Sequence, residues 1–165
     1  MAVHRLLQFP DPVNEVSARL VAGGVVCLAL VTVVTGSPWL LALLAYGFVA
    51  RVLSGPTLSL LGQFVTRVVT PRVPFAAKEV PGPPKRFAQG IGATFSVGAC
   101  IAWFGFGNLD VTRVLVGFIV IAATLESVFA LCLGCKLFAF LMRVGVIPES
   151  VCERCANIAI VASSS

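Results

Sequence analysis

Four long apolar stretches, separated by short turns or polar segments, constrain the fold of this chain more than any other feature. Each is long enough for a helix of roughly 15–22 residues, which can cross the hydrocarbon core of a bilayer. Only 12% of the 165 residues are charged and the mean hydropathy is +1.00, unlike soluble domains. The sequence therefore predicts an all-α integral membrane protein, a four-helix bundle that forms a single domain over residues 1–165.

Turn signals between the apolar stretches set the expected boundaries. The Thr-Gly-Ser-Pro sequence at 35–38 allows only a tight turn, so the first two spans should form a helical hairpin. Residues 56–69 carry apolar side chains on one helical face and polar ones on the other, which is typical of an interfacial amphipathic helix. The following residues 71–86 are rich in proline and are predicted to form a loop. We expect spans at 16–34, 38–52, 87–106 and 111–133, a helical continuation at 136–144, and a short C-terminal cytoplasmic helix at 148–160.

Basic residues indicate how the bundle lies in the membrane. The segment 51–86 holds six Lys and Arg residues, whereas the two turns at the other end contain only Arg113. Cytoplasmic loops of membrane proteins carry such an excess of positive charge, so both termini and the cysteine pairs should face the cytoplasm. The net charge of +5 does not indicate nucleic-acid binding, because no basic cluster is interleaved with aromatic residues.

Two Cys-x-x-Cys pairs near the C-terminus are the candidate site for chemistry. They are Cys132/Cys135 and Cys152/Cys155, separated by sixteen residues. This spacing allows four thiolates to close on one tetrahedral zinc ion, which would staple the last helix to the end of the fourth span. A structural four-cysteine zinc site is therefore one prediction, and zinc is the one cofactor that the sequence suggests. The only histidine, His4, is not required as a ligand.

Each pair also has the spacing of a dithiol redox couple. Cytoplasmic thiols are kept reduced, so a permanent structural disulfide is not expected there. Gly134 could loosen the helix beside Lys136, and Arg154 lies inside the second pair, where positive charge makes a thiolate available. A redox or sulfur relay with Cys132 and Cys135 as catalytic residues is thus the second prediction. In the third, the cysteines only pack as small, soft side chains at a helix junction.

Glu126 lies inside the last apolar stretch, where an ionised carboxylate is costly unless it is paired or protonated. Its candidate partners at that depth are Arg19, Arg51 and Asn14, and a clamp between spans one, two and four is the expected role. Asn14 is also expected to cap the first helix. The alternative role is proton transfer coupled to the thiols. On a straight helix Glu126 points away from Cys135, so that transfer is not expected to be a direct relay.

Four ordered motifs resemble one known family. They are FPDPVNEVSARL at 9–20, RVLSGP at 51–56, PKRFAQGIG at 84–92 and TLE…CLGCK at 124–136. Together they are similar to the bacterial membrane proteins grouped as domain of unknown function 4395, over about residues 9–157. The trailing CERC and the IPES before it resemble the actinobacterial branch. The resemblance marks the following motif positions and implies no catalytic role for any of them: Asn14, Arg51, Glu126, Cys132 and Cys135.

Members of that family are often encoded near thioredoxin-like proteins and rhodanese-type sulfurtransferases, so the resemblance favours a thiol or sulfur relay. We therefore predict a multi-span protein of the bacterial inner membrane, without catalytic activity on its own, whose cysteines serve a soluble thioredoxin-like or rhodanese-type partner or a larger membrane complex. The alternative is a non-enzymatic assembly subunit with a structural zinc site. A lipid or quinone pocket beside the small residues of the third span is a weaker option, because the sequence offers no polar head-group site.

Overall fold

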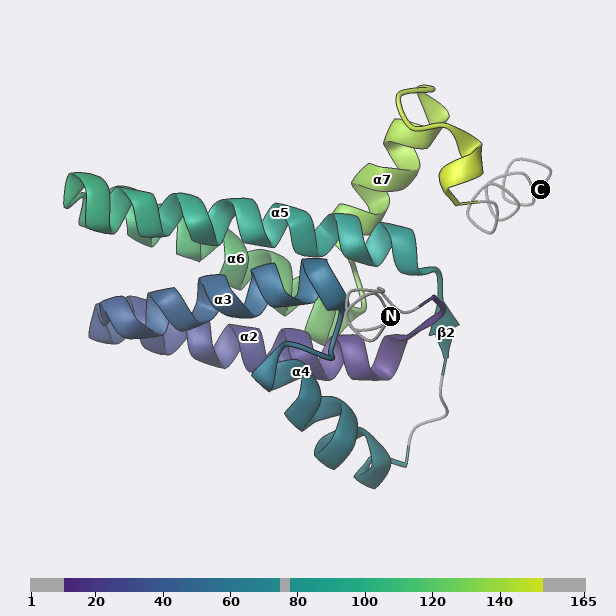
Figure 1. Cartoon of the computed structure of the whole chain (residues 1–165), viewed down its shortest axis with the longest axis horizontal. Helices are drawn as coiled ribbons and strands as arrows, with labels where there is room; N and C mark the ends of the chain where they lie inside the picture. The colour runs from purple at the N-terminus through teal and green to yellow at the C-terminus, as the bar shows by residue number, and fades with distance from the viewer. Residues whose placement is uncertain (1–10, 75–77, 153–165) are drawn as a thin grey trace, which may run out of the picture.

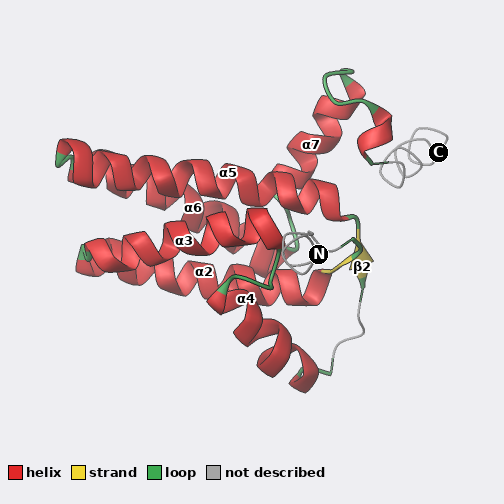
Figure 2. Cartoon of the chain, in the orientation of Figure 1, coloured by secondary structure: helices red, strands yellow, loops and turns green. Residues whose placement is uncertain are grey.

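The computed structural model describes residues 11–74 and 78–152, and it is all-α apart from one pair of two-residue strands. Four helices lie side by side as a bundle (Figure 1): α2 (Glu15–Thr35), α3 (Pro38–Ser54), α5 (Gly82–Cys100) with a π-helical extension (Ile101–Gly105), and α6 (Leu109–Phe129). Helix α2 packs mainly on α6, and α3 packs mainly on α5. Figure 2 shows how little of the described chain lies outside helices.

The first helical hairpin follows the predicted boundaries because its end signals are local. The Asn14 side chain accepts hydrogen bonds from the backbone N–H groups of Val16 (2.9 Å) and Ser17 (3.4 Å), so it caps α2 as expected. Gly36 takes a left-handed conformation, with φ of 60°, that ends the helix. Pro38 then occupies the first turn of α3, where its missing N–H group is not needed.

The interior of the bundle is apolar, and so is most of its outer surface. Small residues such as Ala29 and Ala99 are fully buried between the helices, which lets the backbones approach closely. Many large apolar side chains point outward, as expected for a bundle surrounded by lipid. Helices α2, α6 and the extended α5 are each long and apolar enough to cross a membrane, and α3, with 17 residues, is at the lower limit.

Helix α5 begins at Gly82, earlier than the predicted start at residue 87. Pro83 and Pro84 lie in its first turn, where proline fits because the N–H groups have no partner within the helix. The prediction of a loop up to residue 86 was therefore wrong: these prolines begin a helix. As a consequence Lys85 belongs to the bundle.

The predicted amphipathic helix at 56–69 is present but shorter and irregular. It consists of α4 (Leu60–Phe64), a π-helical turn (Val65–Val69) and a 3-10 turn (Thr70–Arg72). The segment leaves the bundle at an angle (Figure 1), and the side chains of Leu60 and Phe64 are exposed. Its location at the membrane interface stays a prediction.

The fourth span ends at Phe129, before the predicted limit of residue 133. Ala130 has a left-handed φ of 56°, a conformation that costs about 1–2 kcal/mol for a residue with a Cβ atom. The Leu131 N–H group then donates to the Leu125 carbonyl at 3.0 Å and closes the end of α6. Helix α7 (Leu133–Arg143) follows, so the helix predicted at 136–144 is present, but it runs away from the bundle (Figure 1) and does not continue the fourth span.

A short antiparallel ladder ties the start of α2 to the segment before α5. Its strands are β1 (Val13–Asn14) and β2 (Glu79–Val80). Beside the ladder, the Glu15 N–H group donates to the Lys78 carbonyl at 2.8 Å, and the Lys78 ammonium lies 3.2 Å from the Glu15 carboxylate. This end of the bundle also carries α7 (Figure 1).

Candidate functional site

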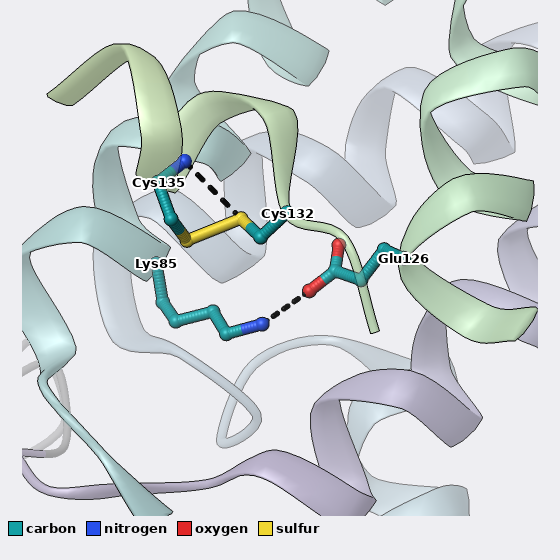
Figure 3. The surroundings of a disulfide bond; sticks show 4 residues. All are labelled: Lys85, Glu126, Cys132 and Cys135. Carbon is teal, nitrogen blue, oxygen red and sulfur yellow. Dashed lines mark hydrogen bonds and ion pairs between the residues drawn. A yellow bond between two sulfur atoms is a disulfide. The ribbon is translucent and has the colours of Figure 1, made fainter. Parts of the chain in front are cut away.

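Cys132 and Cys135 form a disulfide at the start of α7 (Figure 3). Their Cα atoms are 5.2 Å apart, within the usual range for a disulfide. Cys132 is the N-cap of α7, and its Sγ atom accepts a hydrogen bond from the Cys135 N–H group at 3.3 Å. Cys132 is buried, whereas Cys135 is only half-buried. The two cysteines joined by this bond therefore differ in their exposure to solvent.

Because residue 134 is a glycine, the first turn of α7 can pack directly against α5. A Cβ atom there would lie 2.5 Å from the Ala88 Cα atom, closer than real atoms approach. The next turn of α7 is held by Phe138, whose ring meets the Phe87 ring edge-on at 5.6 Å between centroids. Gly134 is thus a contact residue within a regular helix, rather than a residue that loosens the helix as predicted.

Lys85 and Glu126 form an ion pair beside the disulfide (Figure 3). The Lys85 Nζ atom lies 2.5 Å from Glu126 Oε1, and the two side chains are 10% and 14% exposed. The pair joins α5 to α6 and gives the carboxylate a partner in apolar surroundings. Of the three predicted partners of Glu126, Arg51 lies close enough to interact with it electrostatically, as expected. Arg19 and Asn14 bind other groups, and the ion pair is formed by Lys85, which the prediction had placed in a loop.

The two arginines bind other groups near this pair. Arg19 donates from Nη2 to the Ser127 carbonyl at 3.0 Å, one of the carbonyls left without a helical partner at the end of α6. Arg51 is buried, lies over the Phe48 ring at 4.6 Å and donates from Nε to Gln89 Oε1 at 2.9 Å. These contacts clamp α2 to α6 and α3 to α5.

A cavity of about 300 Å³ lies between α3, α5, α6 and α7, next to the disulfide. Cys132 forms part of its wall, Glu126 and Gln89 contribute polar groups, and most other lining residues are apolar. The break at Ala130 brings Glu126 and Cys132 to this one cavity, which a straight helix would not do. The cavity therefore combines a disulfide-bonded cysteine, the Glu126 carboxylate and apolar space.

The second cysteine pair lies at the edge of the described chain. Cys152 is buried and disulfide-bonded, and Cys155 lies outside the described residues. Of the helix predicted at 148–160, the structure describes a 3-10 turn (Glu149–Val151), and the remainder also lies outside the described residues. Within the described ranges, no three His, Cys, Asp or Glu side chains gather as metal ligands would. The four-cysteine zinc site stays a prediction.

Comparison with known proteins finds one family match, which covers all four helices of the bundle. The model of the family described as Domain of unknown function (DUF4395) matches residues 13–143, which is most of the chain. The chain belongs to the DUF4395 family. No curated protein and no solved structure matches it. The DUF4395 match contains Lys85, Glu126 and the first cysteine pair, and it ends before Cys152.

Sequence reasoning missed three parts of this DUF4395 site: Lys85, Gln89 and the break at Ala130. Lys85 follows two prolines, a pattern that can begin a helix as well as end one. Gln89 lies four residues further along and so shares a face of α5 with Lys85. No local signal marks Ala130, because alanine is the strongest helix former.

Proposed function

We propose that Cys132 and Cys135 form a redox-active dithiol–disulfide couple that serves a soluble thioredoxin-like or rhodanese-type partner at the cytoplasmic face of the bacterial inner membrane. One observation carries this proposal: the two cysteines are within bonding reach at a helix N-terminus, with one sulfur buried beside a charged pair and the other more accessible. Such a couple would pass electrons or sulfur for its partner and would not act as an enzyme alone.

The exchange step uses the difference in access between the two sulfur atoms. A partner thiolate attacks Cys135 Sγ, the bond to Cys132 breaks, and Cys132 leaves as a thiolate. The N-terminus of α7 stabilises that thiolate, because the Cys135 N–H group points at Cys132 Sγ. A second partner thiol then attacks the mixed disulfide, which releases the partner as a disulfide and leaves two thiols behind. With a rhodanese-type partner, the reduced Cys135 would accept a sulfane sulfur as a persulfide.

Exposed basic side chains support a partner on this side of the membrane. Two lie on α7, two on the helical turns that follow α4, and one near the start of α5: Lys136, Arg143, Arg67, Arg72 and Arg86. An excess of Lys and Arg is typical of cytoplasmic loops, so we assign this end of the bundle to the cytoplasm. An acidic surface on the partner would be complementary to it and would speed the encounter.

A structural zinc site in an assembly subunit is the competing proposal. It would use Cys132, Cys135, Cys152 and Cys155 as thiolates, and therefore requires all four to be reduced. The disulfide between Cys132 and Cys135 favours the redox couple, because sulfur atoms joined to each other cannot serve as thiolate ligands.

Trapping the mixed disulfide tests the proposal. Cys132→Ser leaves Cys135 as a single thiol, which can displace 2-nitro-5-thiobenzoate from the activated cysteine of a thioredoxin-like protein whose second cysteine is replaced. The mixed disulfide should then accumulate, because neither protein keeps a thiol that could break it. Cys135→Ser is the matched control and should trap far less, because Cys132 is buried. Both variants also carry Cys152→Ser and Cys155→Ser, so that any trapped disulfide must come from the first cysteine pair. Equal trapping, or none, by both variants would contradict the proposed roles.

Metal analysis of the anaerobically purified wild-type protein separates the two proposals. We expect little zinc, and a disulfide between Cys132 and Cys135 that forms and breaks reversibly as the redox buffer is changed. About one zinc ion per chain, with all four cysteines protected from alkylation, would overturn the redox proposal.

A further inference from the structure

We propose that the cavity beside Cys132 binds a lipid-soluble quinone, and that this quinone oxidises the reduced Cys132–Cys135 pair. The inference rests on the proposed redox function and names the electron acceptor for it. Electrons would then pass from a soluble dithiol partner, through the cysteine pair, to a carrier dissolved in the membrane.

The rim of the cavity is made of side chains that face lipid. Phe118 and Ile121 of α6 line the cavity and are 54% and 58% exposed. Leu133 and Leu137 of α7 line it as well and are also exposed. On a bundle surrounded by hydrocarbon, a ligand that enters past these side chains must be dissolved in the bilayer. Charged, water-soluble acceptors such as nucleotides are therefore poor candidates, and apolar ring compounds are good ones.

The polar groups of the cavity suit the carbonyl oxygens of a quinone ring. Gln89 Oε1 accepts from Arg51 Nε at 2.9 Å, so the NH2 group of the amide is the one that can donate to a ligand oxygen. Glu126 lines the same cavity beside Lys85 and can take up and release a proton. Apolar walls with a few polar groups, enclosing about 300 Å³, are typical of small-molecule sites. A bare acyl chain would use neither polar group.

The position of the disulfide assigns one sulfur to each redox partner. Cys132 forms part of the cavity wall, whereas Cys135 lies outside the lining and is half-buried. A ligand in the cavity therefore meets Cys132, which leaves the half-buried Cys135 for the protein partner. Two partners in different phases can thus act on one bond without competing for the same atom.

The proposed reaction balances in electrons and protons. The Cys132 thiolate adds to a ring carbon of the quinone and forms a sulfur–carbon bond. The Cys135 thiolate then attacks Cys132 Sγ, so the sulfur–sulfur bond forms, the sulfur–carbon bond breaks and its electron pair stays with the ring. The two protons lost by the thiols equal the two gained by the ring oxygens, and Glu126 passes them. One dithiol is oxidised for each quinone reduced to hydroquinone.

The test uses the full-length protein in lipid nanodiscs, reduced with dithiothreitol, freed of reductant and mixed with decylubiquinone or a short-chain menaquinone. We expect quinone absorbance to fall as the Cys132–Cys135 disulfide forms, with one disulfide per quinone consumed. Ala122→Phe would fill the cavity from α6 and should slow this oxidation about tenfold or more. Ala42→Phe, at an exposed position of α3 that does not line the cavity, is the matched control and should keep the wild-type rate.

Trapping of the partner at Cys135, measured in parallel, distinguishes this inference from the proposed function. If the quinones leave the thiols reduced while the partner is still trapped, the quinone inference is wrong and the redox function stands. If neither reaction occurs, both are wrong. Equal oxidation rates in Ala122→Phe and the wild type would overturn the inference, because oxidation would then not need the cavity. So would a phospholipid, detected by native mass spectrometry, that Ala122→Phe removes and decylubiquinone does not displace.

Discussion

Lys85 Nζ lies 2.5 Å from Glu126 Oε1, and this pair joins α5 to α6 about one turn before the chain breaks at Ala130. Both side chains are largely buried, so each charge depends on the other for its stabilisation. Because Glu126 and Cys132 line the same cavity, the pair also supports the wall that holds the buried sulfur.

Removing one member of this pair should be more damaging than removing both. Lys85→Met leaves the Glu126 carboxylate in apolar surroundings, and breaking a buried pair in this way typically costs about 3–5 kcal/mol. The double variant Lys85→Met/Glu126→Leu removes both charges of the pair, so we expect it to recover part of the loss; the recovery stays incomplete because buried Arg51 also interacts with Glu126. Thermal unfolding in detergent, followed by circular dichroism, measures both. A double variant that is less stable than Lys85→Met would show that the loss of stability in Lys85→Met does not come from the unpaired Glu126 carboxylate.

Gly134→Ala should separate α7 from α5, because the added methyl group would overlap the Ala88 backbone. We expect a lower Tm and faster alkylation of Cys132 by a maleimide in the reduced protein. The matched control is Gly90→Ala on α5, where a Cβ atom would meet nothing within 4 Å. Alanine favours a helix over glycine by about 1 kcal/mol, so this control should hold or raise the Tm. Similar responses from the two variants would contradict the proposed contact.

Ala130→Gly should stabilise the protein by about 0.5–1 kcal/mol, because glycine adopts a positive φ without the steric cost that alanine bears. Ala130→Val should have the opposite effect, since a β-branched residue is strongly disfavoured in this conformation. Ala42→Gly, inside α3, controls for the general effect of glycine and should destabilise by about 1 kcal/mol. Denaturant unfolding in mixed micelles compares the three, and a destabilising Ala130→Gly would argue for a continuous helix at this point.

The membrane orientation can be tested with single cysteines in a variant whose six native cysteines are replaced by alanine. Ser37→Cys lies in the turn between α2 and α3, and Ser150→Cys lies beyond α7. We expect an impermeant thiol reagent to label the first in intact cells and the second only after the membrane is permeabilised. The reverse pattern would move the Cys132–Cys135 site, and any partner, to the outer side.

The features that could be predicted from the sequence depend on neighbours within a few residues. Asn14 caps α2 and Gly36 ends it through local backbone contacts, so these boundaries agree with the predicted ones. The four motifs also indicated the DUF4395 family, which the family match confirms, while the actinobacterial branch stays a prediction.

The geometry of the site could not be predicted because contacts between distant segments decide it. Ala130 breaks a helix that its own sequence favours, and the packing of Gly134 on Ala88 shows what holds the new direction of the chain. The ion pair of Glu126 needed the position of Lys85, which depends on whether two prolines end or begin a helix. The cavity is formed by four helices, so no single stretch of sequence could indicate it.

Helices α4 and α7 leave the bundle on opposite sides (Figure 1), and both carry outward apolar side chains such as Phe64 and Phe140. A smooth rod of helices can shift along the membrane normal at modest cost. If α4 and α7 lie at the boundary between head groups and acyl chains, their apolar side chains would oppose such a shift. The two helices would thereby keep the Cys132–Cys135 disulfide at a constant depth, at the membrane interface.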